Sequence, residues 1–551
     1  MILSFGVRCG AGWAFRSLRR SFFFLTSEPK EKDLIGVIDQ GTSSTRFIVF
    51  NAATGKLVCK HQVSIAREHP RLGWVQQSAS QIYQSVITCM NDAAATLKAR
   101  WISPERISAI AITNQRETTI AWNSKTGKPV CPAIVWSDNR TSECIQDLIK
   151  KYNDNRFTFQ KYTGLPIDSY FSAMKIHWML HNHCEVMGTY TRGKLMVGTV
   201  DSWLIYKLTG GRHLTDYTNA SRTNLFNINS FQFDQDLCEA YGLSDYILPS
   251  VITSAEVYGK INDRNCRLYG VQLGGVLGDQ QAALVGQTWE SNPERKVSKV
   301  KVTLGTGAFI LWDIGESPQL NSHGLLTTIA HKMGPEANTH YALEGSIASS
   351  GATMDWIQNK LGMFYDHASG GKLAEEALKR RGSREDACYL IPAFFGLLCP
   401  YWRDDAKSIL VGFDEDCTRG DVIAAGYRSS AYQTHAVLQA ACEHSDGEKR
   451  EPPKQISVDG GLSKSSVLMQ SLADITGATV YRPNNSEVIT ALGAAIASAI
   501  SVTIDPSKLV ELRRYLTDEE MEANTFKPRV DEKTRQKWIQ GFENAVKLSL
   551  T

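Results

Sequence analysis

An aspartate at the start of a predicted helix is the residue best placed to do chemistry in this sequence. Asp279 follows the apolar run 273–277, which is typical of a strand, and precedes the helical pattern 280–287. The free N–H groups and the dipole of a helix N-terminus favour the ionised form of a carboxylate. An ionised carboxylate can take the proton of a hydroxyl group. An aspartate here is also a common helix N-cap, and the two roles are compatible.

A second group of polar residues occupies a predicted turn far upstream. Arg116 and Glu117 end the segment Asn-Gln-Arg-Glu at 114–117, between the strand-like runs 107–113 and 118–122. Adjacent donor and acceptor side chains can bind neighbouring hydroxyl groups of a polyol with opposite hydrogen-bond directions. The alternative interpretation is a solvated turn that carries a charge pair.

Aromatic residues could complete such a polyol site. Trp136 ends the strand-like run 133–136, and an indole face is a suitable wall for a short carbon chain. Tyr170, within 167–171, could add a hydroxyl contact. Single aromatic residues at such positions are also common in cores and at sheet edges.

The segment Asp-Gln-Gly-Thr-Ser-Ser at 39–44 could hold phosphate. Its glycine lets the backbone approach an anion, and successive N–H groups in such a turn form an anion-binding nest. The hydroxyl groups of Thr42, Ser43 and Ser44 add further donors. Asp39 precedes the turn and could reach a magnesium ion carried by a nucleotide. The alternative is an ordinary β-hairpin.

The pattern of a glycine turn between two apolar strands occurs a second time. Gly305, Thr306 and Gly307 lie between apolar residues that run from 302 to 311. This repetition predicts two domains of related design, each with a phosphate-facing hairpin. Gly460 and Gly461, after the strand-like run 455–458, would allow close approach of an adenine or ribose, unless they form a plain strand-to-helix turn. A polyol site combined with phosphate sites indicates a small-molecule kinase.

Strand-like and helical segments alternate along the chain, which predicts an α/β fold. The predicted helices are 80–100, 280–287, 424–442, 463–476 and 488–500. The polar stretch 288–299 is the best candidate for a domain boundary, and the polar stretch 443–454 is interpreted as a surface insertion.

Composition excludes several other classes of protein. The 551 residues are too many for one core, 42% are hydrophobic and 21% charged, and no apolar run is long enough to cross a bilayer. The net charge of +3 is supplied by the four arginines of residues 1–27, so the rest of the chain gives no electrostatic support for binding nucleic acid or a membrane surface. The twelve cysteines form no C-x-x-C pair and no Cys/His metal spacing, which favours reduced, mostly buried thiols.

The N-terminal stretch is rich in arginine and free of acidic residues. This composition is typical of a mitochondrial presequence. An unstructured extension is the alternative, and residues 1–33 are excluded from the predicted fold in either case. The predicted location is therefore mitochondrial or cytoplasmic.

Taken together, these segments resemble the FGGY carbohydrate kinases, and among them most closely the members that phosphorylate glycerol. The matching stretches are 38–44, 112–119, 163–172, 198–204, 215–223, 278–284, 324–330, 341–345 and 490–495. The tetrapeptide at 114–117 is the part that favours glycerol over pentuloses or gluconate.

The resemblance implies an actin-like ATPase fold, also called ribonuclease H-like, with two related domains around a cleft. Residues 34–288 would form the N-terminal domain on the glycerol and phosphate side, and residues 289–551 the C-terminal domain on the nucleotide side. Asp279 would be the general base in the transfer of phosphate from ATP to glycerol, with sn-glycerol 3-phosphate as the product. A homo-oligomer, dimer or tetramer, is expected by the same resemblance.

The resemblance also assigns binding roles. The glycerol contacts would be Arg116, Glu117, Trp136, Tyr170, Asp279, Gln280 and Phe309. The ATP contacts would be Thr42, Ser43, Ser44, Arg46, Gly305, Thr306, Gly351, Asp355, Gly461 and Ser465. Asp39 would lie near Mg²⁺.

The sequence departs from the family pattern mainly on the nucleotide side. Asp355 stands where glutamine is expected, Ser465 where the asparagine of the adenine pocket is expected, and Phe395 where serine or threonine is expected. Arg428 and Ser137 are further departures. Two alternatives therefore stay open: a kinase for another small polyol, and a weakly active relative that binds glycerol. The glycine-rich regulatory loop of bacterial relatives has no match at 261–270, so inhibition by a sugar bisphosphate is not expected.

Overall fold

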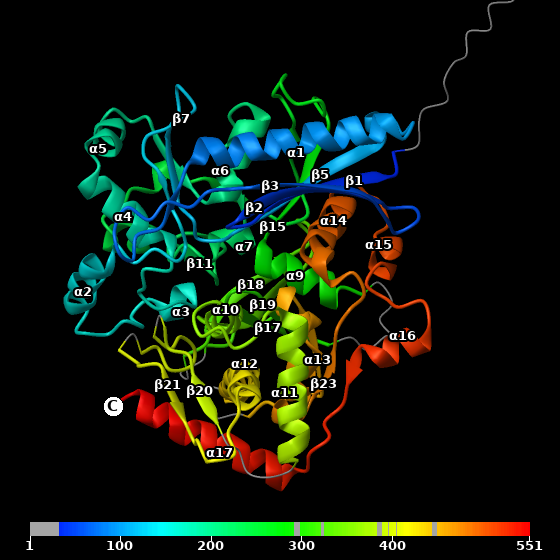
Figure 1. Cartoon of the computed structure of the whole chain (residues 1–551). Helices are drawn as coiled ribbons and strands as arrows, with labels where there is room; N and C mark the ends of the chain where they lie inside the picture. Colours follow the sequence, from blue (N-terminus) through cyan, green and yellow to red (C-terminus); the bar gives the residue numbers. More distant parts are fainter. Residues whose placement is uncertain are drawn as a thin grey trace, which may run out of the picture. The chain divides into compact units, whose positions relative to one another are not determined.

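The computed structural model describes residues 32–290, 298–320, 324–382, 388–394, 396–403, 405–443 and 449–551. The predicted presequence, most of the predicted boundary at 288–299, part of the insertion at 443–454, and Phe395 lie outside the described residues. Contacts within the chain separate residues 1–31 from residues 32–551. The second of these units carries all the helices and strands labelled in Figure 1.

Two large sheets of related strand order form the framework. The first sheet runs, in order, through β14 (Val257–Lys260), β15 (Gln272–Gly278), β5 (Ile107–Asn114), β1 (Leu34–Gln40), β2 (Ser44–Asn51) and β3 (Lys56–Ser64). The second runs through β18 (Leu326–Lys332), β19 (Thr339–Ile347), β17 (Ala308–Gly315), β16 (Val300–Leu304), β22 (Gln455–Asp459), β23 (Thr479–Tyr481) and β24 (Thr525–Phe526). In the first sheet the antiparallel strands β3, β2 and β1 are extended by the parallel strands β5 and β15. In the second sheet the antiparallel strands β18, β19, β17 and β16 are extended by the parallel strands β22 and β23.

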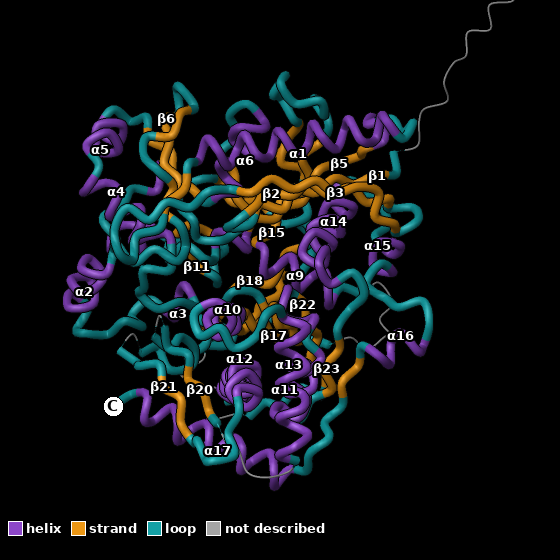
Figure 2. Tube along the Cα trace, in the orientation of Figure 1, coloured by secondary structure: helices purple, strands orange, loops and turns teal. Residues whose placement is uncertain are grey.

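Helices and short strands cover these sheets (Figure 2). In the first half the helices are α1 (Ala79–Ala99), α2 (Ser142–Lys151), α3 (Gln160–Thr163), α4 (Ser172–Asn182), α5 (Cys184–Thr191), α6 (Val200–Thr209), α7 (Tyr217–Ala220), α8 (Gln235–Ala240) and α9 (Asp279–Thr288). In the second half they are α10 (Gly351–Asn359), α11 (His367–Arg381), α12 (Arg419–Cys442), α13 (Ser466–Thr476), α14 (Ile489–Ser501), α15 (Ser507–Glu511), α16 (Asp518–Ala523) and α17 (Glu532–Ser549). The shorter strands are β4 (Gln76–Gln77), β6 (Ile120–Asn123), β7 (Lys128–Pro129), β8 (Ala133–Ile134), β9 (Leu195–Gly198), β10 (Leu214–Asp216), β11 (Phe226–Asn227), β12 (Gln232–Phe233), β13 (Ser250–Ile252), β20 (Tyr389–Ile391) and β21 (Ile409–Val411).

The first sheet is buried on both faces, which explains its nearly continuous apolar strands. Every residue of β1 is buried. Helix α1 packs with Ile38 and Phe47 on one face, whereas α14 packs with Ile35 and Val37 on the other. Helix α14 comes from the second half of the sequence, so the two halves of the chain interlock at the first sheet.

Helix α9 joins the cores of the two sheets. Its residue Val285 packs in the cluster formed by α14 and the first sheet, and Leu284 packs with Leu311 and Ala342 of the second. Helices α9 and α14 touch through their backbones, because a Cβ atom at Gly493 would overlap the carbonyl oxygen of Ala282. The first residue of α9, Asp279, is therefore held rigidly between the sheets.

Most predicted elements are present, and the differences are local. The strand-like run 118–122 forms a strand only from Ile120, after an isolated bridge at Thr119. The run 133–136 is reduced to β8, so Trp136 lies in the turn after a strand. Helix α12 begins earlier than predicted, because Thr418 and Asp421 form a capping box. The run 463–476 is divided, because Ser465 caps α13 and a short 3₁₀ turn precedes it.

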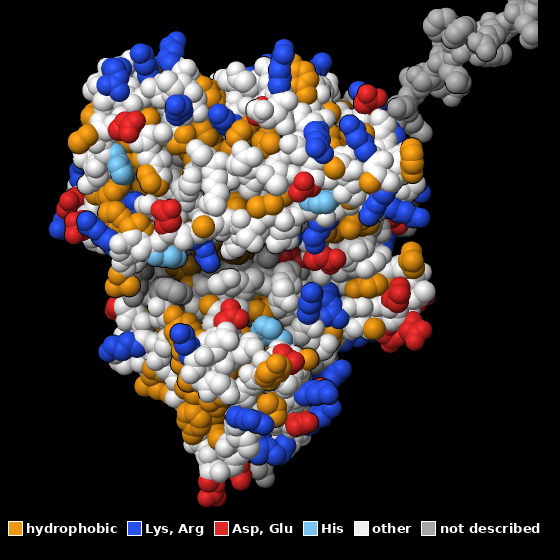
Figure 3. Space-filling view, turned by 45° about the horizontal axis from the view of Figure 1, so that its top comes forward, with side chains coloured by type: hydrophobic (Ala, Val, Ile, Leu, Met, Phe, Trp, Pro, Cys, Tyr) orange, Lys and Arg blue, Asp and Glu red, His pale blue; other side chains and the backbone are white. Residues whose placement is uncertain are grey.

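The surface charges and the cysteines are arranged as the composition predicted, with no large basic area on the face shown in Figure 3 and mostly buried, free thiols. On the face drawn in Figure 3 basic and acidic side chains are interspersed, and the middle of that face is hollowed. The cysteines among the described residues are free, and most are buried. Within the described ranges, no helix has the length and apolar character needed to cross a membrane.

We expect Gly493→Ala to destabilise the protein by about 3 kcal/mol, because the added methyl group must separate α9 from α14. Gly371→Ala in α11 is the matched control, since its Cβ meets no atom of the described residues within 4 Å. This control should be neutral or stabilising by about 0.5–1 kcal/mol. Thermal unfolding of both variants checks the prediction, and equal midpoints would contradict the close packing of the two helices.

Candidate active site

Asp279 lies where β15 passes directly into α9. Its side chain is 30% exposed, and its Oδ1 atom accepts the N–H of Gln280 at 2.8 Å and lies 3.4 Å from Arg116 Nε. The N-cap of α9 is Gly278, so Asp279 does not cap the helix. A Cβ atom at Gly278 would lie 2.7 Å from Arg116 Cδ, so the glycine makes room for the arginine.

Arg116 and Glu117 belong to a buried ring of charges. Both side chains are 2% exposed, which rules out the solvated turn. The two terminal nitrogens of Arg116 donate to Glu344 at 2.7 Å each, and Arg222 Nε donates to Glu117 Oε1 at 2.6 Å. Arg222 also lies 3.4 Å from Glu344. Two guanidinium groups and two carboxylates thus balance one another inside the protein.

Three residues of this site were not predicted from the sequence: Arg222, Glu344 and Lys301. Glu344 and Lys301 interrupt the apolar strands β19 and β16, and a charged residue inside such a strand is itself a signal of a functional or paired group. Lys301 is fully buried. Its Nζ atom donates to Gln280 Oε1 and, at 2.9 Å, to Thr303 Oγ1.

Burial and charge set the proton affinities of the site. Burial raises the pKa of Asp279 to about 6, although Arg116 opposes the shift. The N–H of Gln280 at the helix terminus lowers the pKa of Asp279 as the sequence predicted, but burial has the larger, opposite effect. Burial also opposes ionisation of Glu344, but Arg116 and Arg222 lower the pKa of this carboxyl group to about 2. Burial lowers the pKa of Lys301 to about 8.

The three predicted aromatic residues form a wall beside the charged ring. The ring centroid of Trp136 lies 5.8 Å from that of Tyr170 and 6.1 Å from that of Phe309. The guanidinium carbon of Arg222 lies 5.3 Å from the centroid of Tyr170. Trp136 Nε1 donates to Thr42 Oγ1 at 3.0 Å, so the wall is connected to the first glycine turn.

The first glycine turn is the predicted hairpin between β1 and β2. Gly41 N–H donates to Ser44 O at 2.9 Å, and Ser43 at the tip is exposed. Asp39 is buried at the end of β1, where its Oδ2 atom lies 2.7 Å from a terminal nitrogen of Arg46. Burial raises the pKa of Asp39, and Arg46 acts in the opposite direction.

The second glycine turn packs against the start of α10. Gly351 N–H donates to Gly305 O and Ser350 N–H to Thr306 O, both at 2.9 Å. A Cβ atom at Gly351 would lie 2.5 Å from Gly305 O, so the residue must be small. The structure thus brings together three of the predicted nucleotide contacts.

The remaining predicted nucleotide contacts, Asp355, Gly461 and Ser465, have different surroundings. Gly460, with φ +91°, packs against Leu304 O, whereas a Cβ atom at Gly461 would meet no described atom within 4 Å. Ser465 accepts the N–H of Leu468 as the cap of α13, and Asp355 is exposed on α10.

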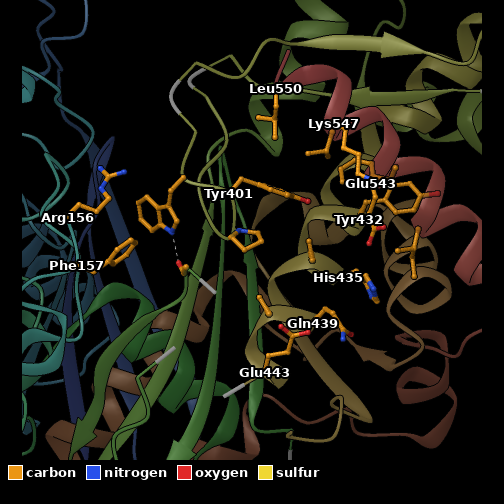
Figure 4. A pocket seen from close by; sticks show the side chains of 18 residues that line it. Arg156, Phe157, Tyr401, Tyr432, His435, Gln439, Glu443, Glu543, Lys547 and Leu550 are labelled. Atoms are coloured by element: carbon orange, nitrogen blue, oxygen red, sulfur yellow. Dashed lines mark hydrogen bonds between the residues drawn. The ribbon is translucent and has the colours of Figure 1, made fainter. Parts of the chain in front are cut away.

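A cavity of about 720 Å³ lies elsewhere (Figure 4). Arg156 and Phe157 face Tyr432, His435 and Glu543 across it, and Trp402 Nε1 at its edge donates to Gly324 O at 2.6 Å. None of the predicted site residues lines this cavity. Asp279 therefore remains the candidate catalytic residue.

Two family models match the chain in sequence order. The model of the N-terminal domain of the FGGY family of carbohydrate kinases matches residues 34–286, and the model of its C-terminal domain matches residues 300–502. The chain belongs to the FGGY family of carbohydrate kinases. The family resemblance inferred from the sequence is thereby confirmed.

Several relatives of this FGGY protein are named glycerol kinases. The glycerol kinase of Arabidopsis thaliana is 37% identical over 527 residues, covering 94% of this chain and 98% of that protein. A probable glycerol kinase of Caenorhabditis elegans is 36% identical, with 94% and 99% covered. The crystal structure of Plasmodium falciparum glycerol kinase with ADP is 30% identical, covers 94% of this chain and 98% of that one, and superimposes with a TM-score of 0.82.

More distant solved structures support the fold alone. A xylulose kinase from Lactobacillus acidophilus is 17% identical and superimposes with a TM-score of 0.77, with 94% of this chain and 98% of that one covered. The two-domain α/β fold predicted from the sequence is confirmed by these matches and by the related strand order of the two sheets.

We expect Asp279→Asn to stabilise the protein at pH 8 and to have little effect at pH 4. The folded-state pKa of about 6 lies above the ordinary value of 3.8, so ionisation opposes folding above about pH 6 and not below about pH 4. The gain at pH 8 should be about 1–3 kcal/mol. Thermal midpoints at the two pH values check this, with Asp147→Asn, exposed on α2, as the control. A gain that does not depend on pH would contradict the raised pKa.

Proposed function

We propose that this protein transfers the terminal phosphoryl group of ATP to glycerol and releases sn-glycerol 3-phosphate. The observation that carries the proposal is the arrangement of Asp279 next to the buried pair Arg116 and Glu117, with the aromatic wall beside their charged ring. The glycerol kinases to which the chain is similar over nearly its whole length support the choice of substrate.

The acceptor site suits a short polyol. Trp136, Tyr170 and Phe309 offer ring surface to a three-carbon chain, while Arg116 and Glu117 offer a donor and an acceptor to its hydroxyl groups. Because these charged groups are already paired and held in place, little rearrangement is needed when glycerol binds, and its reacting hydroxyl can be oriented accurately.

In this proposal Asp279 receives the proton of the hydroxyl group that attacks ATP. A pKa of about 6 leaves the carboxylate mainly ionised at neutral pH and still basic enough to bind the proton as the new bond forms. The proton passes from the glycerol oxygen to the Asp279 carboxylate, the oxygen forms its bond to the γ-phosphorus, and ADP leaves.

The two glycine turns are proposed to hold the phosphates of ATP through backbone N–H and hydroxyl groups. Lys301 interacts electrostatically with both Asp279 and Asp459, so its ammonium group can offset the negative charge of the phosphates. When bound with ATP, Mg²⁺ would supply further charge neutralisation. Asp39 and Asp459 are buried carboxylates at strand ends, a donor type that suits this ion.

We also infer a mitochondrial location from the arginine-rich residues 1–27. Fractionation of cells that express the full chain or a chain lacking residues 1–33 tests this, and an unchanged distribution would contradict it. A dimer or tetramer stays a prediction from family resemblance, and sedimentation would decide it.

A coupled kinase assay on the full chain tests the proposed reaction. Glycerol, erythritol, xylulose and gluconate are compared at equal concentrations with ATP and Mg²⁺. Turnover should be highest with glycerol. Turnover with another acceptor but not with glycerol would indicate a different polyol kinase. Absence of ATP binding by calorimetry, with and without glycerol, would indicate a binding protein.

We expect Asp279→Asn to lower kcat about 10²–10⁴-fold, because the proton acceptor is lost. Glycerol binding should change little, since the amide keeps the shape of the side chain. The comparison variant is Glu117→Gln, which retains an oxygen acceptor but weakens the pairing with Arg222 and should mainly raise KM for glycerol. Steady-state kinetics of both variants check this contrast. Nearly normal kcat in the Asp279 variant would exclude its role as the base.

A further inference from the structure

Three potential metal ligands meet on neighbouring strands of the second sheet, away from Asp279. Asp313 lies on β17, His331 on β18 and His340 on β19. His331 and His340 are direct partners in the register of β18 and β19, and Asp313 pairs with Ala342, two residues from His340. One potential ligand atom of each residue lies within 4.8 Å of the other two.

One nitrogen of this group lacks a partner among the described residues. His331 is buried, and its Nδ1 atom makes no hydrogen bond with them. Leaving such an atom unsatisfied costs about 1–3 kcal/mol. The chain contains another stacked histidine pair, His177 and His181, whose Nδ1 atoms lie 2.8 Å from backbone carbonyl oxygens. The unpartnered nitrogen is therefore not a general consequence of stacking two imidazoles.

The remaining contacts orient the ligands. His340 Nδ1 lies 3.3 and 3.4 Å from the two oxygens of Asp313, and Gly315 N–H donates to Asp313 Oδ1 at 2.9 Å. The ring of Trp289 packs edge-on against His331 at a centroid distance of 5.9 Å. A carboxylate fixed by a backbone N–H and an imidazole fixed by packing are typical of prepared metal ligands.

We propose that Asp313, His331 and His340 form a zinc-binding site. Two imidazoles and one carboxylate match the ligands that Zn²⁺ takes in proteins, and a water molecule would complete four-coordination. The rings of His331 and His340 are stacked at 4.6 Å and 20°, so one of them must turn before both nitrogens can face one ion. His340 has the freedom to do so, because its side chain is 32% exposed.

The position of the site indicates a structural role. His340 precedes Glu344 by four residues on β19, and Asp313 follows Phe309 by four residues on β17, a separation of about 13 Å along each strand. Trp289 directly follows α9, the helix that begins with Asp279. Bound zinc would therefore connect β17, β19 and the residue after α9 at the ends of these elements that lie away from the candidate active site. It would not contact the substrates.

The experiment uses full-length protein treated with a chelator and then titrated with Co²⁺ or Zn²⁺. We expect one equivalent of Co²⁺ to give visible absorption bands that Zn²⁺ displaces, and Zn²⁺ to raise the thermal midpoint. His340→Gln and Asp313→Asn should each weaken binding tenfold or more, whereas His181→Gln should bind like the unmodified protein.

The variants separate this proposal from its alternatives. Because His340 and Asp313 are not fully buried, their variants should fold in the absence of metal, which thermal unfolding verifies. Absence of stoichiometric binding would overturn the proposal. Equal affinity in His340→Gln would also overturn it, since the metal would then lie elsewhere, for example on cysteines. The readout is binding, so it does not depend on whether glycerol is the substrate.

Discussion

The structure depends on a ring of four charged side chains that is almost completely removed from water. Arg116 and Glu117 come from the turn after β5, Arg222 follows α7, and Glu344 lies on β19 of the second sheet. Within the ring each guanidinium group contacts both carboxylates, so the four side chains together carry no net charge. Removal of one member of such a set leaves a buried charge uncompensated, which costs about 3–5 kcal/mol. The ring therefore constrains how the two sheets meet.

The same ring determines the state of Asp279. Glu344 occupies both terminal nitrogens of Arg116, so only Nε faces Asp279, at 3.4 Å. This weak pairing does not offset burial, and the pKa of Asp279 rises while that of Glu344 falls. Arg116, together with Arg222, thus favours the ionised form of Glu344 and leaves Asp279 able to accept a proton. Glu344, which forms a structural ion pair, and Asp279, the candidate base, therefore differ in pKa although both contact Arg116.

Close backbone packing holds these groups in position. Gly493 allows α14 to touch α9, Gly278 allows Arg116 to pass the start of α9, and Gly351 allows α10 to approach the second glycine turn. The interlocking of α14 with the first sheet links the two halves of the chain at the helix that carries Asp279. Rigid placement of this kind is what phosphoryl transfer requires, because its rate depends mainly on alignment and charge neutralisation.

The sequence by itself determined the α/β class, the two related sheets, the family, and most residues around Asp279. These features follow from local patterns, namely apolar strands, glycine turns and short polar segments. Such patterns can be recognised without knowing the contacts between distant residues. Only the tertiary structure decided that Arg116 is paired with Glu344, that burial outweighs the helix terminus at Asp279, and that Ser465 serves as a helix cap. It also brought His331 and His340 together. Strand register and burial produce these features, and both arise from contacts between residues far apart in the chain, which no local pattern records.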